Sequence, residues 1–420
     1  MYRLKDAGFQ AFLVGGSVRD LLLGLQPKDF DVATNALPDE VRGIFRNCRL
    51  IGRRFRLAHV YFGSEVIEVA TFRAAHEGEE DERDEDDWRA RDADGDRVLD
   101  ARGRILRDNV YGTVEEDVWR RDFTANALYY NIEDFSVWDF VDGVRDVGAR
   151  QLRLIGDPVT RYHEDPVRML RAVRFAAKLG FGLEPATERP LLELAYLLTH
   201  VPPARLFEEI LKLFLGGFGS RALVLLRQYG MLEHLFPSTA AALAAPDSAP
   251  SRLLVRGIEN TDARVAADKP VTPTFLFAIF LFSPIVERAR ELGGELDTHH
   301  LFVACEEVVR EQQGRITIPR RFTLPMREMF TLQPRFHRRE GRKALSFLHH
   351  PRFRAAYDLL LLRAEAGVED PEIAKWWTDV QTMPAEERDS LARTSPPAGG
   401  TGARRSRRRR RRRRPASGNQ

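Results

Sequence analysis

Residues 12–32 read FLVGGSVRDLLLGLQPKDFDV, an order that indicates a strand, a tight turn, a helix and a second strand. The last part holds two aspartates, Asp29 and Asp31, separated by Phe30. Residues i and i+2 of a strand face the same way, so both carboxylates should project together, roughly 7 Å apart at Cα, with Phe30 turned toward the core. Carboxylates held side by side repel each other unless a cation lies between them. Mg²⁺ suits this position because it prefers hard oxygen ligands and bridges to phosphate.

The glycine pair, Gly15 and Gly16, follows an apolar run, Ala11–Val14, that is typical of a buried strand. We expect Ser17 to cap a short helix that ends at Gly24. Glycines let the backbone approach a ligand closely, and a helix N-terminus favours phosphate. The turn is therefore predicted to hold a triphosphate beside the two aspartates. The alternative is a tight strand–helix connection that binds nothing.

A second motif pairs two arginines, Arg120 and Arg121, with Asp122. Two guanidiniums are able to clamp a triphosphate, and the carboxylate could orient the ribose or approach the metals. The alternative is that Asp122 caps a helix and the arginines lie on the surface. Glu68, on an earlier strand-like segment, is another candidate for a third catalytic carboxylate. The sequence leaves the choice between Glu68 and Asp122 open.

A third motif, EDPVRMLRAVRF at residues 164–175, is predicted to be helical from Asp165, with Pro166 at the first helical position. Asp165 and Arg168 are three residues apart and share a face. A carboxylate acceptor beside a guanidinium donor matches the edges of adenine and cytosine and rejects guanine and uracil. The alternative is a solvent-facing helix on which Arg168 pairs with Asp165 or Glu164. Three more cations follow on the same face, Arg171, Arg174 and Lys178.

Together these motifs resemble the signatures of the polymerase-β-like nucleotidyltransferases, in the class II family of CCA-adding enzymes and bacterial poly(A) polymerases. The resemblance covers most of residues 7–380 and is densest in the first 180. It implies an α/β head with a mixed sheet and helices, followed by an all-α C-terminal region. It also implies a metal-dependent enzyme that binds two Mg²⁺ ions at Asp29 and Asp31, or Mn²⁺ in their place. The implied catalytic residues are Asp29, Asp31 and Asp122. The implied nucleotide-binding residues are Gly15, Gly16, Arg19, Arg120, Arg121, Asn126, Asp165, Arg168 and Arg171.

The segment LIGRRFRLAHV at residues 50–60 and the Arg-rich tail are similar to the poly(A) polymerase side of this family. That similarity implies template-independent addition of AMP from ATP to RNA 3′ ends, with release of pyrophosphate, in RNA polyadenylation and turnover. One alternative is a CCA-adding enzyme, which acts on tRNA and also uses CTP. Another is an RNA-binding protein that keeps this fold without catalysis, although the intact Asp29 and Asp31 disfavour it.

The chain of 420 residues is long enough for several domains. We expect a head at 1–150 with a flexible acidic insertion at 77–104, a helical neck at 151–220, a helical body at 221–385 and a disordered tail at 386–420. The two cysteines indicate no disulfide framework, no signal peptide is recognisable, and the longest apolar run, residues 275–282, is too short to span a bilayer. These features favour the cytoplasm.

Arginine-rich segments suggest contacts with RNA phosphates. Ten arginines between residues 404 and 414 exceed the net charge of +3, so the rest of the chain is acidic overall. We expect this tail to bind RNA or RNA-decay proteins. Further RNA-binding candidates are Arg53, Arg54, Arg174 and Lys178, and the basic stretches 319–321 and 335–343. The alternative for each is an ordinary solvated face.

Overall fold

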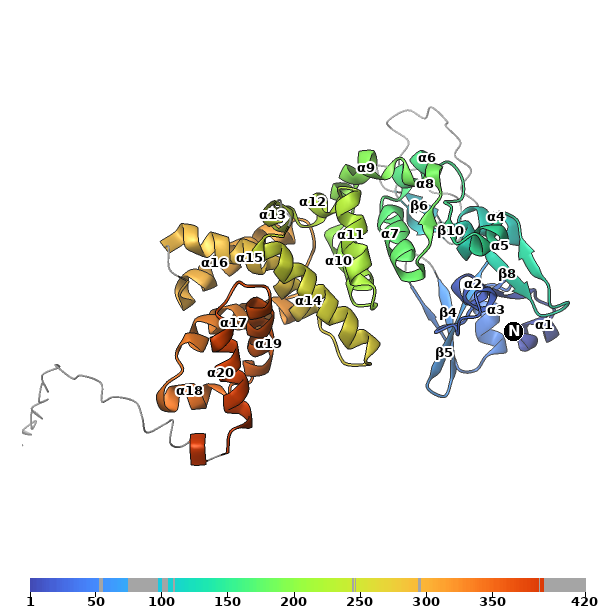
Figure 1. Ribbon diagram of the computed structural model, residues 1–420. Helices are drawn as coiled ribbons and strands as arrows, with labels where there is room; N and C mark the ends of the chain where they lie inside the picture. Colours follow the sequence, from blue (N-terminus) through green and yellow to red (C-terminus); the bar gives the residue numbers. More distant parts are fainter. Residues whose placement is uncertain are drawn as a thin grey trace, which may run out of the picture.

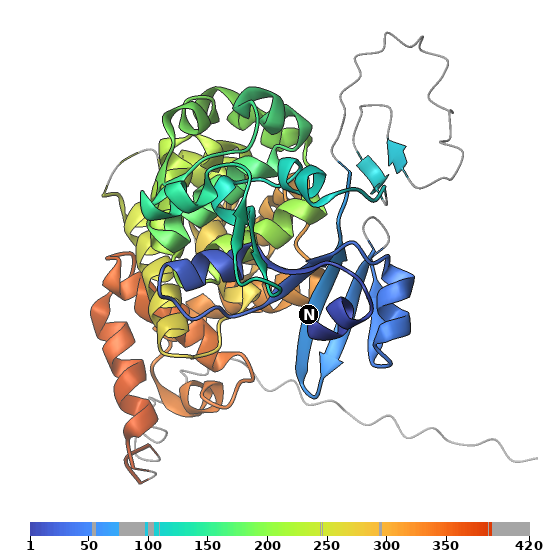
Figure 2. The same cartoon turned by 90° about the vertical axis from the view of Figure 1, so that its right-hand side faces the viewer.

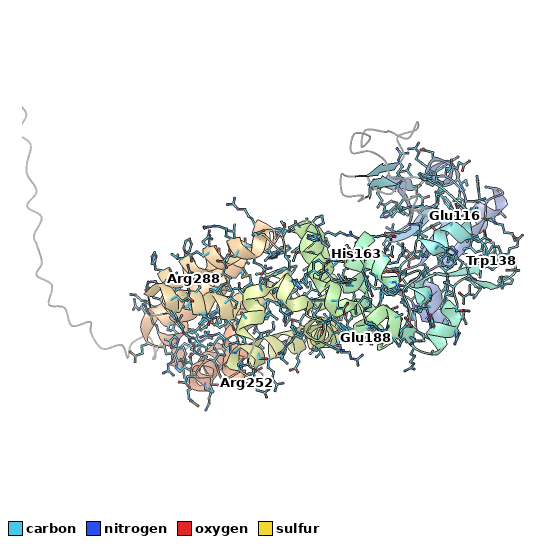
Figure 3. All side chains as sticks on the ribbon, turned by 90° about the horizontal axis from the view of Figure 1, so that it is seen from above. Glu116, Trp138, His163, Glu188, Arg252 and Arg288 are labelled. Atoms are coloured by element: carbon cyan, nitrogen blue, oxygen red, sulfur yellow. The ribbon has the colours of Figure 1, made fainter. Side chains whose placement is uncertain are left out.

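The computed structural model of the chain is elongated, with an α/β head at one end and helices extending away from it (Figure 1). Side chains are described for residues 1–52, 56–74, 110–243, 245, 247–293, 296–384 and 386–388, and the backbone for 97–99 and 105–108. Seen from above, Glu116 and Trp138 of the head lie at the opposite end from Arg252 and Arg288 (Figure 3). Arg53, Arg54, the Arg-rich tail and all of the acidic insertion except residues 97–99 lie outside the described residues.

The head is built on one mixed sheet. Its strands are β1 (Ala11–Val14), β2 (Asp31–Thr34), β3 (Cys48–Ile51), β4 (Leu57–Phe62), β5 (Glu65–Thr71), β8 (Leu128–Asn131) and β9 (Val137–Asp139). They lie in the order β3-β4-β5-β2-β1-β8-β9. Strands β2 and β5 run parallel, and the other neighbours in this sheet are antiparallel. The mixed sheet confirms the expected fold class. Two small pairs add β6 (Arg97–Leu99) with β7 (Ile105–Asp108) and β10 (Gln151–Leu152) with β11 (Gly182–Leu183).

Alternation along the central strands divides the apolar core of the head between the two faces of the sheet. On one face Val32 and Val69 pack with residues of α1 (Tyr2–Asp6) and α3 (Pro38–Ile44). Figure 2 shows α3 beside the blue strands. On the other face Phe12 and Ala33 pack against α4 (Val114–Trp119). Asp31, two residues before Ala33, therefore faces the α4 side.

Phe30 lies on the same side as Val32 and opposite to Asp31, but it is not a core residue. Its side chain is 43% exposed and lines an open apolar pocket together with Phe62 and Ile67. The prediction that Phe30 turns into the core was therefore right about the face of the sheet and wrong about burial. Strand β2 begins one residue later, at Asp31, so Phe30 precedes the part of the strand that the helices cover.

Helices account for most of the chain after the sheet. Within the head and at its end these are α2 (Gly16–Leu22), η1 (Thr124–Asn126), α5 (Gly143–Gly148), α6 (Pro158–Glu164) and α7 (Val167–Leu179). The remaining helices are α8 (Pro185–Glu188), α9 (Leu191–Leu194), η2 (Ala195–His200), α10 (Pro203–Phe214), α11 (Gly219–Gln228), α12 (Met231–Leu235), α13 (Pro237–Ala242), α14 (Ala249–Ala266), α15 (Pro273–Gly293), α16 (Thr298–Gln313), α17 (Arg320–Leu332), η3 (Gln333–His337), α18 (Gly341–Phe347), α19 (Phe353–Glu365) and α20 (Pro371–Thr382).

One apolar cluster runs from Leu13 and Val18 in the head to Leu362 in α19, so the head and the helices share a continuous core. A second cluster surrounds Trp377, whose indole Nε1 donates a hydrogen bond to the carbonyl of Phe336 over 2.8 Å. The apolar run 275–282 is buried within α15. In the described part of the chain, none of the helices combines the length and apolarity needed to cross a bilayer.

Three local expectations need correction at element ends. Helix α2 begins at Gly16 with Gly15 as its N-cap, and the Ser17 hydroxyl instead donates to the carbonyl of Val14. Helix α7 begins at Val167, and Pro166 is its N-cap rather than its first residue. Asp29 precedes β2 instead of lying within it. Gly15 takes the N-cap position of α2 because its φ of +72° lies outside the helical range, and Pro166 has no backbone N–H to enter the helical hydrogen bonds of α7.

Candidate active site

Three carboxylates, those of Asp29, Asp31 and Glu68, lie near the start of β2, where Asp29 and Glu68 act electrostatically on Asp31. Asp31 is the first residue of β2 and lies opposite Glu68 in the parallel pairing with β5. Burial raises the pKa of the Asp31 carboxyl, the negative charges of Glu68 and Asp29 raise it further, and Arg121 opposes this rise. The carboxylates therefore lie in an environment with too little positive charge, which a divalent cation would correct.

This donor set fits Mg²⁺ in the way that the ion usually binds, through one or two carboxylates with the remaining positions left to water and substrate phosphates. Within the side chains that the structure describes, no three His, Cys, Asp or Glu residues stand close enough to form a complete metal cage. Asp29 and Asp31 are thus suited to a metal that arrives with the nucleotide. Glu68 has a further neighbour, because His59 Nε2 lies 3.2 Å from its Oε1.

The glycine turn lies next to these carboxylates. Gly15 has φ +72°, a left-handed conformation that side chains disfavour. A Cβ atom at Gly15 would stand 3.4 Å from Nη1 of Arg121 and 3.6 Å from the carbonyl oxygen of Asn126. Strand pairing of Val14 with Asp31 brings this turn beside the first carboxylate of β2. The turn, the arginine and the carboxylates therefore meet on the α4 face of the sheet.

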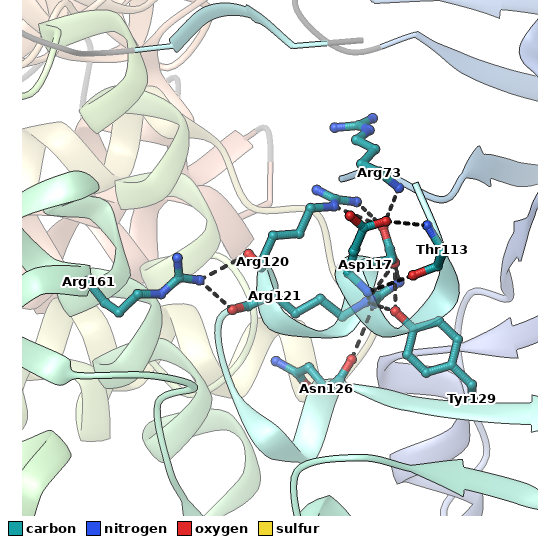
Figure 4. A network of polar contacts seen from close by, with 9 residues as sticks. Arg73, Thr113, Asp117, Arg120, Arg121, Asn126, Tyr129 and Arg161 are labelled. Atoms are coloured by element: carbon teal, nitrogen blue, oxygen red, sulfur yellow. Dashed lines mark hydrogen bonds and ion pairs between the residues drawn. The ribbon is translucent and has the colours of Figure 1, made fainter. Parts of the chain in front are cut away.

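Both predicted triphosphate arginines share a single buried partner, Asp117 of α4 (Figure 4). Asp117 Oδ1 accepts from Nε and Nη2 of Arg120 at 2.9 and 2.5 Å. Its Oδ2 accepts from Nε and Nη2 of Arg121 at 3.3 and 3.1 Å, and from the Tyr129 hydroxyl at 2.6 Å. Burial alone would raise the pKa of Asp117, but the two guanidiniums outweigh it and lower the pKa to about 2. Asp117 is thus ionised at neutral pH.

The backbone of the arginine pair is fixed as well. Arg161 of α6, only 9% exposed, donates from Nη2 to the carbonyls of Arg120 and Arg121 over 3.1 and 2.7 Å (Figure 4). The Arg121 guanidinium also lies 4.9 Å from the ring centre of Tyr129. Sequence reasoning did not identify Asp117, Tyr129 or Arg161. The spacing of Asp117 from Arg120 and Arg121, three and four residues along a helix, is the signal that could have revealed the first.

Asp122 lies in a second cluster, between the head and α7. Its Oδ2 accepts from Nε of Arg171 over 2.6 Å, and its Oδ1 accepts from the Phe123 amide and from Nδ2 of Asn126. Burial opposes ionisation of Asp122, but Arg171 lowers its pKa overall. Arg171, Phe123 and Asn126 all donate to this carboxylate. This carboxylate is therefore already neutralised, in contrast to Asp31.

Arg19 belongs to this second cluster rather than to the surface. It is 2% exposed, pairs with Asp20 of its own helix, and donates from Nη1 to Oδ1 of Asn126. Its guanidinium also stands 3.4 Å from the Cβ position of Gly16, so the second glycine leaves room for it. Arg19, Gly16 and Asn126 together tie α2 to η1.

The predicted nucleotide-selecting pair, Asp165 and Arg168, lies where α6 meets α7, and each member is bound to a different partner. Asp165 Oδ2 accepts from Nη2 of Arg205 in α10 over 2.7 Å. Arg168 donates from Nη1 to Glu164 and to the carbonyl of Arg161, both at 2.8 Å. The Glu164–Arg168 ion pair that the sequence offered as an alternative therefore exists. Arg205 holds the Asp165 carboxylate, and Glu164 holds the Arg168 guanidinium. A hydrogen-bond acceptor and a donor are therefore fixed separately near the start of α7.

The other two cations of α7 differ in exposure, because Arg174 is half-buried and Lys178 is exposed. Arg174 lies 3.8 Å from the Glu209 carboxylate of α10 and over the ring of Phe175. Burial lowers the pKa of the Lys178 ammonium, while Asp20 and Asp29 act in the opposite direction. Lys178 is thus electrostatically linked to Asp29, the first of the two predicted metal-binding aspartates.

Comparison with known proteins places this geometry in a family. Three family models match the chain: the poly A polymerase head domain at residues 11–153, a probable RNA and SrmB-binding site of polymerase A at 180–243, and the polymerase A arginine-rich C-terminus at 294–414. The chain is 49% identical to poly(A) polymerase I of Escherichia coli O157:H7 and 48% identical to that of Haemophilus influenzae. The alignments cover 93% of this chain and 83% and 85% of those proteins.

Relatives on the CCA-adding side match less of the chain. The CCA-adding enzyme of Lacticaseibacillus paracasei is 37% identical over 51% of this chain and 48% of its own length. Among solved structures, a tRNA-processing enzyme superposes with a TM-score of 0.59 at 21% identity, covering 93% of this chain and 99% of the other. A tRNA nucleotidyltransferase complexed with a primer tRNA and an incoming ATP analog gives 0.57 at 22% identity, covering 90% and 97%. These structures show that the fold is shared.

Because the sequence matches extend over nearly its whole length, the chain belongs to the poly(A) polymerase I family and is a polynucleotide adenylyltransferase.

Proposed function

We propose that AMP transfer to RNA 3′ ends takes place on the α4 face of the head sheet, where Asp29, Asp31, Arg121 and the Gly15 turn meet. The position of Arg121 carries this proposal. Its guanidinium acts electrostatically on Asp31 and stands 3.4 Å from the Cβ position of Gly15. A triphosphate bound by this arginine would therefore lie within reach of both the glycine turn and the carboxylates.

Enzymes of this family depend on a metal, and Asp29 and Asp31 are the residues that would hold it. We propose Mg²⁺, in two ions, with Mn²⁺ as a substitute. When bound, such ions lower the pKa of the RNA 3′-hydroxyl and neutralise charge on the pyrophosphate. For the third carboxylate we favour Glu68 over Asp122. Glu68 raises the pKa of Asp31 and so lies close to it, whereas Asp122 is committed to Arg171.

The remaining residues position the nucleotide. Arg120 and Arg121 would hold the triphosphate, and Asp122 and Asn126 would face the sugar. Asp165 and Arg168 would accept from the exocyclic amine of adenine and donate to its ring nitrogen. In the reaction the RNA 3′-oxygen forms a bond to the α-phosphorus of ATP, the bond to the β-phosphate oxygen breaks, and pyrophosphate leaves. The hydroxyl proton passes to solvent.

We further propose the division of the chain into a head at 1–150, a neck at 151–220, a body at 221–385 and a tail from 386. The RNA upstream of the 3′ end would follow the neck and body. The arginine-rich tail would add binding strength or recruit RNA-decay proteins. Location in the cytoplasm is part of the same proposal.

Product analysis with each nucleotide alone tests this function. The purified chain is incubated with an unstructured RNA and one of the four nucleoside triphosphates, and the product ladder is read on a gel. A long ladder with ATP alone is expected. A parallel reaction uses a tRNA that lacks its CCA end. Incorporation of two cytidines followed by one adenosine, with no longer product, would instead assign the chain to the CCA-adding branch.

A further inference from the structure

Asp117 is a buried carboxylate for which the transfer reaction has no direct use. It is 2% exposed and accepts hydrogen bonds from both arginines of the second motif and from the Tyr129 hydroxyl. Its Oδ1 also accepts from the backbone amide of Arg73 at the end of β5, over 3.2 Å. One side chain therefore joins β5, α4, β8 and the arginine pair (Figure 4).

The contacts use the same edge of each guanidinium. Arg120 and Arg121 both face Asp117 with Nε and Nη2. Nη1 of Arg121 donates instead to the carbonyl oxygen of Asn126 over 3.3 Å. It lies 3.4 Å from the position that a Cβ atom would take at Gly15. Nη1 of Arg120 makes no hydrogen bond to the residues that the structure describes. Both arginines thus keep one donor edge fixed, and Arg121 presents its other edge toward the glycine turn.

A carboxylate in this position does not favour anion binding by its charge. It offsets one of the two guanidinium charges and would repel a nearby triphosphate. What it supplies is orientation, because a planar guanidinium held along one edge can turn its other donors in one direction only. Fixing donors before the substrate arrives lowers the entropy cost of binding it in the reactive position.

We propose that Asp117 is a positioning residue for catalysis, which aims Arg120 and Arg121 at the triphosphate of ATP. Tyr129 assists it, because its hydroxyl accepts from Nε of Arg121 over 2.7 Å while donating to Asp117. This inference rests on the triphosphate role given to the two arginines under the proposed function.

A double-mutant cycle tests the inference. Asp117→Asn is made in the native chain and in a chain carrying R120K and R121K. Lysine keeps the charge but lacks the Nε–Nη2 edge that faces Asp117. We expect D117N to lower kcat/KM for ATP at least tenfold in the native chain and less than twofold in the lysine background, with KM for RNA unchanged in both. Equal losses in the two backgrounds would overturn the positioning role.

Asp146→Asn is the matched control. Asp146 is 1% exposed and is also held by an arginine, Arg153, but it contacts neither Arg120 nor Arg121. A merely structural loss should look like D146N, with the same change of kcat/KM in both backgrounds. If D117N fails to fold, Tyr129→Phe replaces it. This variant removes the hydroxyl and keeps the ring, and we expect a loss of three- to tenfold that also disappears in the lysine background.

The lysine variant separates failure of this inference from failure of the proposed function. If R120K and R121K together leave kcat/KM for ATP unchanged, the arginines do not bind the triphosphate, and both proposals fall. If that variant is impaired and D117N adds its full effect to it, the arginines keep their role and Asp117 does not position them.

Discussion

Asp31 and Glu68 lie opposite each other on the parallel strands β2 and β5, and the negative charge of Glu68 raises the pKa of Asp31. They are separated by more than 30 positions in the sequence. Burial and two like-charged neighbours make this site unfavourable until a cation arrives.

The third catalytic carboxylate can be identified by comparing E68Q with D122N. We expect E68Q to lower kcat at least a hundredfold and to raise the Mg²⁺ concentration required for half-maximal rate, because in the proposed role the Glu68 carboxylate helps to hold the metal. D122N should lower kcat less and leave the Mg²⁺ requirement unchanged, because Asp122 binds Arg171. Primer extension over a Mg²⁺ series measures both. The reverse order of effects would assign the role to Asp122.

D31N should abolish AMP transfer and at the same time stabilise the metal-free protein at pH 7. The folded state raises the pKa of Asp31, so ionisation of this group costs stability at pH 7, and this cost fades as pH falls toward the ordinary carboxyl pKa. Removal of a like-charge pair across neighbouring strands is worth up to about 1 kcal/mol in the free energy of unfolding. Urea unfolding in EDTA, at pH 4 and pH 7, measures the gain. A gain of the same size at both pH values would contradict the electrostatic explanation.

D117N should destabilise the chain in a pH-dependent way. The pKa of Asp117 is lowered to about 2 in the folded state, so its ion pairs contribute stability above the ordinary carboxyl pKa, and this is lost as pH falls toward 2. Breaking a buried pair from one side costs about 3 kcal/mol at neutral pH. Denaturant unfolding between pH 3 and pH 7 should show the gap between native chain and variant narrowing at the acid end. A gap that stays constant would mean that packing, not charge, explains the loss.

D165A should weaken the preference for ATP. Loss of one hydrogen bond to a charged group is worth about 1.5–3 kcal/mol, which corresponds to about ten- to a hundredfold in the ratio of kcat/KM for ATP to that for GTP. Steady-state incorporation of each nucleotide separately gives the ratio. E193A, which alters an exposed acid on the short helix α9, is the matched control and should leave it unchanged. An unaltered ratio in D165A would remove this residue from adenine selection.

Truncation at residue 403 should weaken RNA binding and reduce its dependence on salt. Each arginine that neutralises a phosphate contributes close to one unit to the slope of log K against log salt. Loss of the ten tail arginines is therefore expected to flatten the slope by several units. Filter binding at several salt concentrations measures it, with the catalytic rate on saturating RNA as a control. An unchanged slope would show that the tail does not contact RNA.

Much of the active site could be predicted from local sequence because its parts are local. The strand at Ala11–Val14 follows from its short apolar run. The glycine turn, the Asp-Phe-Asp segment and the RRD motif likewise carry their chemistry within a few neighbouring residues.

Long-range pairing was decided by the tertiary structure. Strand order and register brought Glu68 to Asp31 and exposed Phe30, and helix packing gave Asp165 its partner Arg205 and Asp122 its partner Arg171. No local pattern specifies which distant side chain will neutralise a buried charge, since that depends on how strands align and helices pack. The sequence by itself determined the candidate groups, and the fold determined that Asp122 and Asp165 are paired with distant arginines while Asp31 stands beside like charges.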